Sequence, residues 1–266
     1  GRRGWSAFAV CALVLFAAFI LPVGQLILWA INEINGHVPG TWETVYGQYV
    51  GNTFALAGIA AVVTVGLALL LVHSGRTWKS RFVRGLTRMS TMGYALPGSV
   101  IAAGVLLTIA PVDHQLHDWL GTGLLLTGSI VGLMYAYVVR FMAVAHKSVE
   151  SSMDKVKPSM DEAARTLGAR PLDILRRIQA PLITNGVLVA LILVFVDAMK
   201  ELPATLLLRP FGMDTLGIWA YMLAAESFWQ AASIPALTIV VVGLIPVLLL
   251  MRIDAHQRSI MTYTAL

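Results

Sequence analysis

Six long runs of apolar residues, separated by short polar segments, dominate the pattern of this chain. A helix that crosses a bilayer needs about 20 predominantly apolar residues, because the hydrocarbon core is roughly 30 Å thick. The predicted fold class is therefore all-α, a polytopic membrane protein with a single transmembrane domain over residues 1–266. The six predicted membrane spans lie at approximately 5–31, 52–72, 89–110, 122–145, 182–199 and 231–251.

The composition agrees with a chain that is solvated by lipid. Hydrophobic residues make up 58% of the sequence and charged residues only 12%, and the mean hydropathy is +0.77. These values are too apolar for an ordinary soluble domain. The first run follows Arg2 and Arg3, but it is too long for a signal peptide and lacks a clear small-residue cleavage site. We expect it to remain as the first span.

Lysine and arginine residues are distributed unevenly between the predicted connections. If the N-terminus lies inside and Arg140 marks the inner end of the fourth span, only Lys200 and Arg209 of the 19 basic residues face outward. Such a bias sets the orientation of a membrane protein. We therefore expect a multi-pass membrane protein with both termini in the cytoplasm. The segments placed inside are 1–4, 74–88, 146–181 and the tail from Arg252.

The net charge of +5 then needs no nucleic acid as a partner. The basic segment 74–88 is interpreted as a topology signal that lies against anionic lipid headgroups. The single cysteine, Cys11, cannot form an intrachain disulfide.

The predicted cytoplasmic loop 146–181 has the pattern of a helix, a turn and a second helix. Ser159 and Glu162 have the spacing of a capping box that would begin the first helix. Gly168 suits the left-handed residue that ends a helix. Pro171 suits the first turn of a second helix, which we expect to end at Pro181.

The second predicted helix carries Leu172, Leu175 and Ile178 on one face and Arg176 and Arg177 on the other. From these residues alone, a hairpin that rests on lipid headgroups and a docking element for a partner protein are equally favoured.

The same loop resembles the EAA signature of ABC importer permeases. The resemblance rests on Glu162, Ala163 and Ala164, then Gly168, then Ile178 and Pro181 at the spacing of the signature; Ala180 departs from it, because the family more often has leucine there. In that family the first short helix sits in a cleft of the ATPase subunit. The resemblance implies that Glu162, Ala163, Ala164 and Gly168 carry this coupling here.

Two further stretches, 94–104 and 200–212, resemble the ferric-iron branch of these permeases. Thiamine, phosphonate, polyamine and sulfate permeases are built similarly and stay as alternatives. The chain resembles the second half of a fused, two-half iron permease, which fits its start at Gly1. The resemblance implies a location in the bacterial inner membrane. It also implies three partners: a cytoplasmic ATPase dimer, a periplasmic substrate-binding protein, and a second permease half, fused or separate.

One group of charges lies next to a predicted membrane span. Asp197, Lys200 and Glu201 share one face of a continuing helix and can pair, and Pro203 then breaks that helix. A charge in a span is costly and marks a functional hypothesis, so these residues and Thr205 are candidates for a gate or lining of the translocation path. The alternative is a charge cluster that closes the helix end.

No residue pattern indicates an enzyme or a resident cofactor. The chain lacks the zinc-protease, nucleophile-elbow and P-loop motifs, so ATP and Mg are expected on the partner subunit. His114 and His117, in a predicted outer loop, could share a metal, but a plain polar loop is the favoured interpretation. An ATP-independent carrier remains a weaker alternative, because it would need more ionisable groups at mid-membrane.

Overall fold

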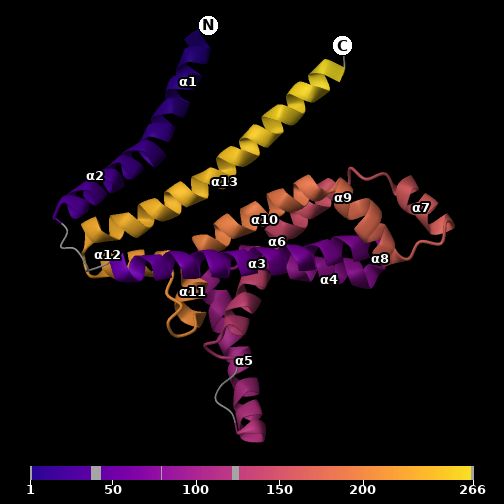
Figure 1. Ribbon diagram of the computed structural model, residues 1–266, viewed down its shortest axis with the longest axis horizontal. Coiled ribbons are helices and arrows are strands. Elements are labelled where there is room, and N and C mark those ends of the chain that lie inside the picture. The colour runs from indigo at the N-terminus through magenta and orange to yellow at the C-terminus, as the bar shows by residue number, and fades with distance from the viewer. Residues whose placement is uncertain (1, 37–42, 79, 122–125, 265–266) are drawn as a thin grey trace. The chain divides into compact units, whose positions relative to one another are not determined.

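The computed structural model describes residues 2–36, 43–78, 80–121 and 126–264, and within these residues the chain is helical and contains no strand (Figure 1). Two compact units divide the chain: residues 1–51 with 214–245 form the first, and residues 52–213 with 246–266 form the second. The helices α3 and α13 contribute to both units.

Five helical stretches of the described chain are long and apolar enough to cross a membrane, and a bent pair of helices supplies a sixth. This confirms the prediction of a polytopic all-α protein. The long elements are α1 (Arg2–Leu15) continued by the π-turn η1 (Phe16–Ile20) and α2 (Leu21–Gly36), then α3 (Glu43–Thr77), α5 (Gly98–Leu120), α6 (Ile130–Met153), α10 (Thr184–Met199) and α13 (Trp229–Thr264).

Shorter elements connect these helices. They are α4 (Arg81–Thr91), the 3-10 turn η2 (Met92–Ala95), α7 (Pro158–Thr166), α8 (Pro171–Ile174), the π-turn η3 (Leu175–Gln179), α9 (Ala180–Leu182), α11 (Pro203–Leu208) and α12 (Leu216–Ala225).

Aromatic side chains hold the first unit together. The rings of Trp29 and Trp229 lie 6.5 Å apart, and Trp219 contacts Tyr49 with ring centroids 5.3 Å apart. The Tyr46 hydroxyl lies 2.6 Å from the Thr238 hydroxyl. Since the alternative in lipid is an unpaired hydroxyl, this bond favours the pairing of α3 with α13.

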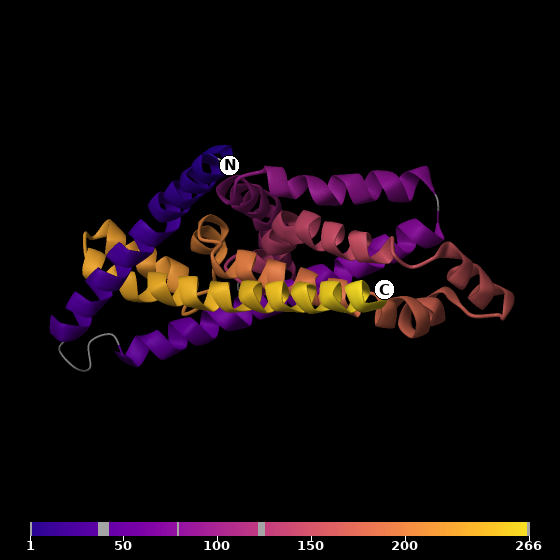
Figure 2. The same cartoon turned by 90° about the horizontal axis from the view of Figure 1, so that it is seen from above.

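In the second unit α6 is the central helix and packs against α4, α5, α10 and α11. Its inner face includes Leu133, Tyr137 and Val149, which are almost completely buried. Gly186 of α10 lies so close to Ser152 of α6 that an added Cβ would overlap this side chain. The short helices α7 and α8 lie together at one end of α3, α6 and α10, as two perpendicular views show (Figures 1 and 2).

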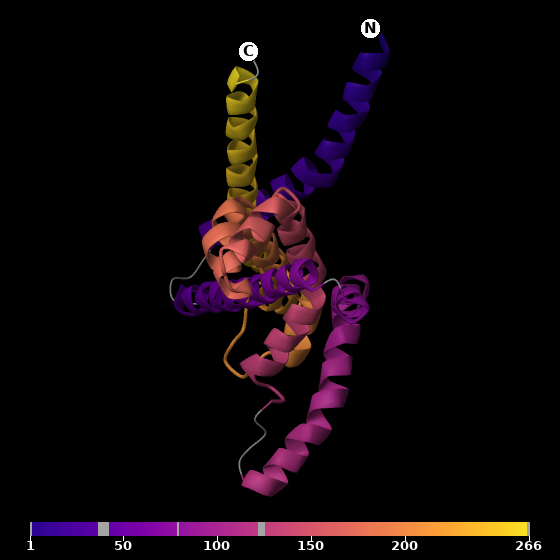
Figure 3. The same cartoon turned by 90° about the vertical axis from the view of Figure 1, so that its right-hand side faces the viewer.

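The third and fourth spans begin later than the sequence indicated. The third was predicted at 89–110, but Met89 belongs to the amphipathic helix α4, and the long helix α5 begins only at Gly98. The break lies at Pro97, which has no amide proton and holds Leu96 in an extended conformation. Figure 3 shows α5 leaving the packed helices of this unit steeply.

The fourth span, predicted at 122–145, corresponds to α6, which begins at Ile130; residues 122–125 of the prediction lie outside the described residues. The last turns of α6 replace the start of the predicted loop 146–181. Ser129 caps its first turn, with the hydroxyl accepting a hydrogen bond from the Val131 amide at 3.2 Å.

Candidate functional site

The helix α7 begins earlier than predicted. Its first residue is Pro158 and its N-cap is Lys157, whose side chain makes no capping bond. The predicted capping box of Ser159 and Glu162 is therefore wrong. Proline has a φ angle already suited to the first helical position, and its missing amide is one of the four that find no partner inside a helix, so it can begin the helix without a side-chain cap.

The turn after α7 confirms the prediction for Gly168. Its φ angle is +82°, in the left-handed region that side chains disfavour. The Ala169 amide donates to the Ala164 carbonyl and the Gly168 amide to the Arg165 carbonyl, both at 3.0 Å. These two bonds form a Schellman motif, which satisfies the last carbonyls of α7.

The two faces of α7 differ in exposure. Asp161 and Ala164 face inward and are 3% and 7% exposed. Glu162 and Ala163 are exposed, and the Leu167 side chain at the end of the helix is 88% exposed. The structure thus separates the residues of the EAA signature: Ala164 is buried, whereas Glu162 and Ala163 are available to a partner.

The second short helix differs from the prediction in its buried face. Ile174, Leu175 and Gln179 are buried, whereas Leu172 is 51% exposed and Ile178 is partly exposed. A π-turn over Leu175–Gln179 rotates the side chains out of the predicted register.

Pro181 does not end this helix, which continues to Leu182 and then bends by 79° into α10. The bend lies at Ile183, with φ −100° and ψ 7°. A proline prevents the ordinary helical bond of its own residue, so it favours both the π-turn before it and the bend after it.

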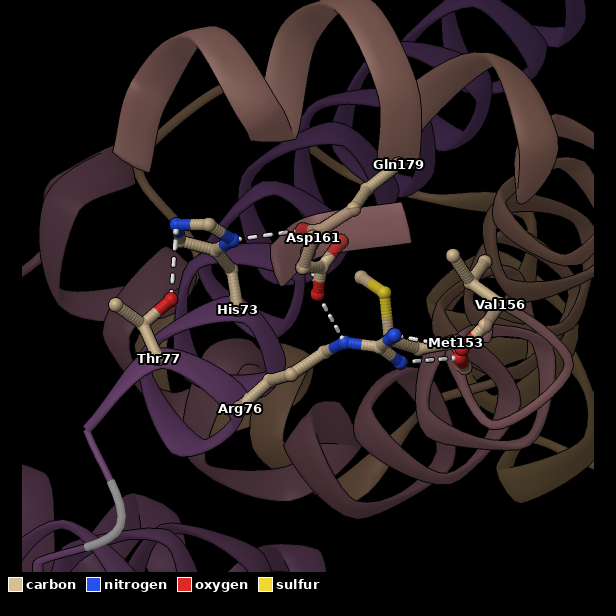
Figure 4. Close-up of polar contacts among 7 residues, drawn as sticks. All are labelled: His73, Arg76, Thr77, Met153, Val156, Asp161 and Gln179. Carbon is tan, nitrogen blue, oxygen red and sulfur yellow. Dashed lines mark hydrogen bonds and ion pairs between the residues drawn. The ribbon is translucent and has the colours of Figure 1, made fainter. Parts of the chain in front are cut away.

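Arg76, in the last turn of α3, joins three elements at one end of the bundle (Figure 4). Its Nε donates to Asp161 Oδ2 of α7 at 2.6 Å. Its two terminal nitrogens donate to the carbonyls of Met153 at 2.8 Å and Val156 at 2.6 Å, where α6 ends. A guanidinium is suited to this position because its planar, always charged fork can donate to a carboxylate and to two carbonyls at a helix end together.

Gln179 extends this arrangement to the second short helix. Its Nε2 donates to Asp161 Oδ2 at 3.0 Å, and its Oε1 lies 2.7 Å from Nδ1 of His73 (Figure 4). Because the amide oxygen accepts here, Nδ1 carries the imidazole proton and Nε2 accepts from the Thr77 hydroxyl at 3.4 Å. The residues His73, Arg76, Asp161 and Gln179 are called the anchor network below.

A second polar cluster lies between α6, α11 and the break before α5. Arg140 Nε contacts Glu201 Oε2 at 2.7 Å, and an Arg140 terminal nitrogen donates to the Leu96 carbonyl. Glu201 Oε1 accepts from the Ala204 amide at 3.3 Å. Arg140 lies near the middle of α6, so its assignment to the inner end of the fourth span is wrong.

The predicted group of three charges is thus divided. Lys200 pairs with Asp197 at 2.8 Å, whereas Glu201 pairs with Arg140. The α10 helix ends at Met199, and Pro203 begins α11. A cavity of about 540 Å³ adjoins both ion pairs and is lined by Tyr94, Arg140, Phe141, Asp197, Lys200, Glu201 and Pro203.

Thr205 is fully buried beside this cluster. Its hydroxyl donates to the Glu201 carbonyl, and it lies 2.5 Å from the Tyr137 hydroxyl. A continuous chain of polar contacts therefore runs from α6 to the first turn of α11.

The two histidines of the predicted outer loop lie instead on α5, where both are exposed. On the same helix, the buried Asp113 accepts hydrogen bonds from the amides of Leu126 and Thr127, at 3.1 Å and 2.7 Å, and so joins α5 to the segment before α6. In the described part of the chain, no group of three His, Cys, Asp or Glu side chains could hold a metal ion, so His114 and His117 gain no further ligand of these types.

Five functional candidates were not identified from the sequence: His73, Arg76, Arg140, Asp161 and Gln179. Two of them had a usable signal. Asp161 is three residues before Ala164 and so shares its helix face, and Arg140 interrupts an apolar run. The partners of the others are distant in sequence, and no local pattern indicates them.

Comparison with known proteins gives a family. A profile described as binding-protein-dependent transport system inner membrane component matches residues 65–258. The chain is 28% identical over 245 residues to the Fe(3+)-transport system permease protein FbpB 2 of Haemophilus influenzae, covering 92% of this chain and 46% of that relative. It is 26% identical over 263 residues to the putative 2-aminoethylphosphonate transport system permease protein PhnV of Salmonella typhimurium, covering 95% and 94%.

Solved structures share the fold. A chain in the crystal structure of the bacterial alginate ABC transporter, in complex with a periplasmic protein bound to alginate pentasaccharide, has a TM-score of 0.73 at 16% identity, covering 94% of this chain and 93% of that one. A chain of the inward-facing MetNI methionine ABC transporter has a TM-score of 0.59 at 15% identity, covering 81% and 97%. The present chain spans about half the length of FbpB 2, at 46%.

Proposed function

We propose that this chain, which belongs to the family of binding-protein-dependent transport system inner membrane components, is one transmembrane half of an ATP-driven importer that docks an ATPase subunit through α7. The observation that carries the proposal is the division of α7 into two faces. Asp161 is buried and bonded, while Glu162, Ala163 and Leu167 are exposed. A short helix that is fixed on one side and open on the other is suited to enter a cleft of a partner.

The proposed partners are those of the family to which the chain belongs. A cytoplasmic ATPase dimer would bind ATP and Mg, a periplasmic binding protein would deliver the solute, and a second permease half would complete the path. The 46% coverage of FbpB 2 is consistent with a fused second half, and the 94% coverage of PhnV is consistent with a separate one. Docking requires α7 in the cytoplasm, which agrees with the orientation predicted from the basic residues.

The translocation path is proposed to pass the cavity beside the two ion pairs. Its charged side chains, Arg140, Asp197, Lys200 and Glu201, lie at or near the helix break that Pro203 follows. Irregular backbone at membrane depth is tolerated where protein or a water-filled cavity satisfies it. This region therefore suits a gate or a polar lining.

Ferric iron is the proposed solute. The support is the similarity to FbpB 2 over 92% of this chain, together with the two stretches that resemble iron permeases. The second candidate is 2-aminoethylphosphonate, which carries charges of both signs. The nearly full-length match to PhnV favours this candidate. The cavity also favours it, because two cationic and two anionic side chains line the cavity and could pair with both charges of the solute.

The test uses the complete complex, purified with its ATPase and binding protein and reconstituted in liposomes. Uptake of radioactive Fe(III) is measured against uptake of 2-aminoethylphosphonate. Ala163→Arg, which places a large side chain on the exposed face of α7, should abolish uptake of the transported solute and release the ATPase. Ala163→Ser keeps the side chain small and should preserve both. Normal ATPase binding by Ala163→Arg would contradict docking through α7.

A further inference from the structure

The anchor network forms a closed ring on one turn of α3. Starting from Arg76, the contacts pass to Asp161 of α7 at 2.6 Å, to Gln179 of η3 at 3.0 Å, and back to His73 at 2.7 Å (Figure 4). His73 and Arg76 are three residues apart and so lie on the same side of α3. Both short helices of the loop are thus fastened to the same place on one membrane helix.

The loop is joined covalently to α10, the next span, through a sharp bend rather than through a network of side chains. Residues 171–182 meet α10 at the 79° bend, and the backbone there has φ −100° and ψ 7° at Ile183. A bend after a π-turn and a proline interrupts the helical bonding that would make two segments rigid. Across the bend, the Ile183 amide donates to the Gln179 carbonyl and the exposed Thr184 hydroxyl donates to the Ala180 and Pro181 carbonyls, each at 3.0 Å. The α10 helix is therefore joined to the loop by these local bonds at a bend, whereas α3 is joined to it by buried bonds between side chains distant in sequence.

Burial and charge strengthen the hydrogen bonds of the anchor network. Asp161 and Gln179 are 3% and 1% exposed, and the Arg76 side chain is 17% exposed. Hydrogen bonds between a carboxylate and a guanidinium are among the strongest in proteins, and a low local dielectric strengthens them further. Asp161 Oδ1 is buried without a partner in the described chain, so Asp161 contributes to the network through Oδ2 and its two donors, Arg76 and Gln179.

We propose that Arg76, Asp161 and Gln179 are positioning residues that make α7 and η3 move as one body with α3, so that ATP-driven motion of the loop enters the membrane through the second span. This inference rests on the proposed docking of an ATPase to α7 and names the helix that receives its motion. The Arg76 bonds to Met153 and Val156 include the end of α6 in the same body.

The experiment measures solute uptake per ATP hydrolysed by the reconstituted complete complex, beside complex yield and ATPase binding. Two variants break the ring differently. Asp161→Asn removes the charge, and Gln179→Met keeps a similar side-chain length while removing both Gln179 contacts. Asp154→Asn is the matched control, because Asp154 is exposed and has no side-chain hydrogen bond within the described residues.

Both network variants should retain ATPase binding, measured by a disulfide or cross-link from Ala163→Cys on the exposed face of α7. Uptake per ATP should fall about tenfold, within the range of measured coupling between protein sites, while Asp154→Asn stays at the wild-type ratio. Arg76→Gln combined with Asp161→Asn should lose less than the sum of the two single variants, since both remove the contact between Arg76 and Asp161.

Two results would overturn the inference. One is a wild-type ratio of uptake to hydrolysis in Gln179→Met, whether or not Asp161→Asn assembles. The other is full additivity of the Arg76 and Asp161 substitutions. Failure of the docking proposal is distinguishable, because the Ala163→Cys cross-link to the ATPase would then be missing in the wild-type background itself.

Discussion

The Arg140 guanidinium lies 2.7 Å from the Glu201 carboxylate and joins the middle of α6 to the short connection between α10 and α11. The Glu201 side chain is 6% exposed and that of Arg140 is 24% exposed. Breaking a buried ion pair by removing one partner leaves an uncompensated charge, whereas removing both is much less costly. A single substitution at Arg140 or Glu201 should therefore destabilise the protein more than replacing both residues together.

Glu201→Gln alone should lower the stability of the folded protein by about 3 kcal/mol, because the Arg140 charge loses its partner. The double variant Arg140→Met with Glu201→Gln should recover much of this loss. Thermal unfolding in detergent, followed by size-exclusion chromatography, measures both. Lys200→Ala is the control, because the Lys200 side chain is 61% exposed. Equal destabilisation by the Lys200 variant would contradict a special role for the buried pair.

Gly98→Ala should weaken the same contact through packing. A Cβ at Gly98 would overlap Glu201 Oε1, and the neighbouring Ala204 amide is held by that oxygen. We expect a loss of about 1 to 3 kcal/mol, as for other overpacked sites. Gly104→Ala, on the same helix with open space at its Cβ, should be neutral or stabilising. The difference in unfolding temperature between the two variants is the measurement.

Hydropathy predicted the number and type of the spans because a chain in lipid must satisfy its backbone within helices. The start of the third span was wrong because the predicted run from Met89 includes the end of the amphipathic helix α4 and the turn η2, and the chain is extended at Leu96 before Pro97 and α5. The left-handed conformation of Gly168 was predicted correctly, because a helix end of this kind favours glycine at one position that can be identified in the sequence.

The anchor network could not be predicted in the same way. Arg76 and Asp161 are 85 residues apart, and His73 and Gln179 are 106 apart. Their contact depends on how α3 packs against the loop, and the π-turn that rotates Gln179 inward has no simple periodicity. The basic segment 74–88 was therefore interpreted only as a topology signal, although Arg76 is the centre of the network.

Gly186→Ala should loosen the packing of α10 on α6. An added Cβ would overlap the side chain of Ser152, and a rotation of the hydroxyl alone does not remove the overlap with the Ser152 Cβ. We expect a loss of about 1 to 3 kcal/mol. Adding Ser152→Gly opens the space and should recover part of the lost stability. The recovery is reduced by about 1 kcal/mol, the cost of a glycine inside a helix. No recovery in the double variant would show that the overlap is relieved elsewhere.

Gly168→Val should uncouple the importer without unfolding it. Nothing lies within 4 Å of a Cβ at Gly168, so the penalty comes only from its φ angle of +82°. Strain of about 1 to 3 kcal/mol is expected there for a β-branched residue. Solute-stimulated ATP hydrolysis should fall while membrane yield stays normal. Gly168→Asn should be milder, because asparagine tolerates the left-handed region.

The matched control is Gly85→Val in α4, where a Cβ also meets open space and φ is not positive. Normal stimulation in Gly168→Val would show that the turn geometry does not matter for coupling, and α7 would lose its proposed role.

The orientation of the chain gives the last prediction. Cys11 is the only cysteine, so Cys11→Ser provides a background in which single cysteines report on one side of the membrane. Phe211 and Leu167 are 104% and 88% exposed and lie on opposite sides in the predicted topology. A membrane-impermeant maleimide should label Phe211→Cys in intact cells and Leu167→Cys only after the membrane is opened.

Adding the purified ATPase subunit to opened membranes should then slow the labelling of Leu167→Cys, because docking on α7 would cover this residue. Labelling of Phe211→Cys should not change, since the ATPase cannot reach the outer side. Labelling of Leu167→Cys in intact cells would contradict both the orientation and the docking, because α7 must face the compartment that holds ATP. Labelling of the expected residue on each side, with no protection by the ATPase, would retain the topology and reject α7 as the docking helix.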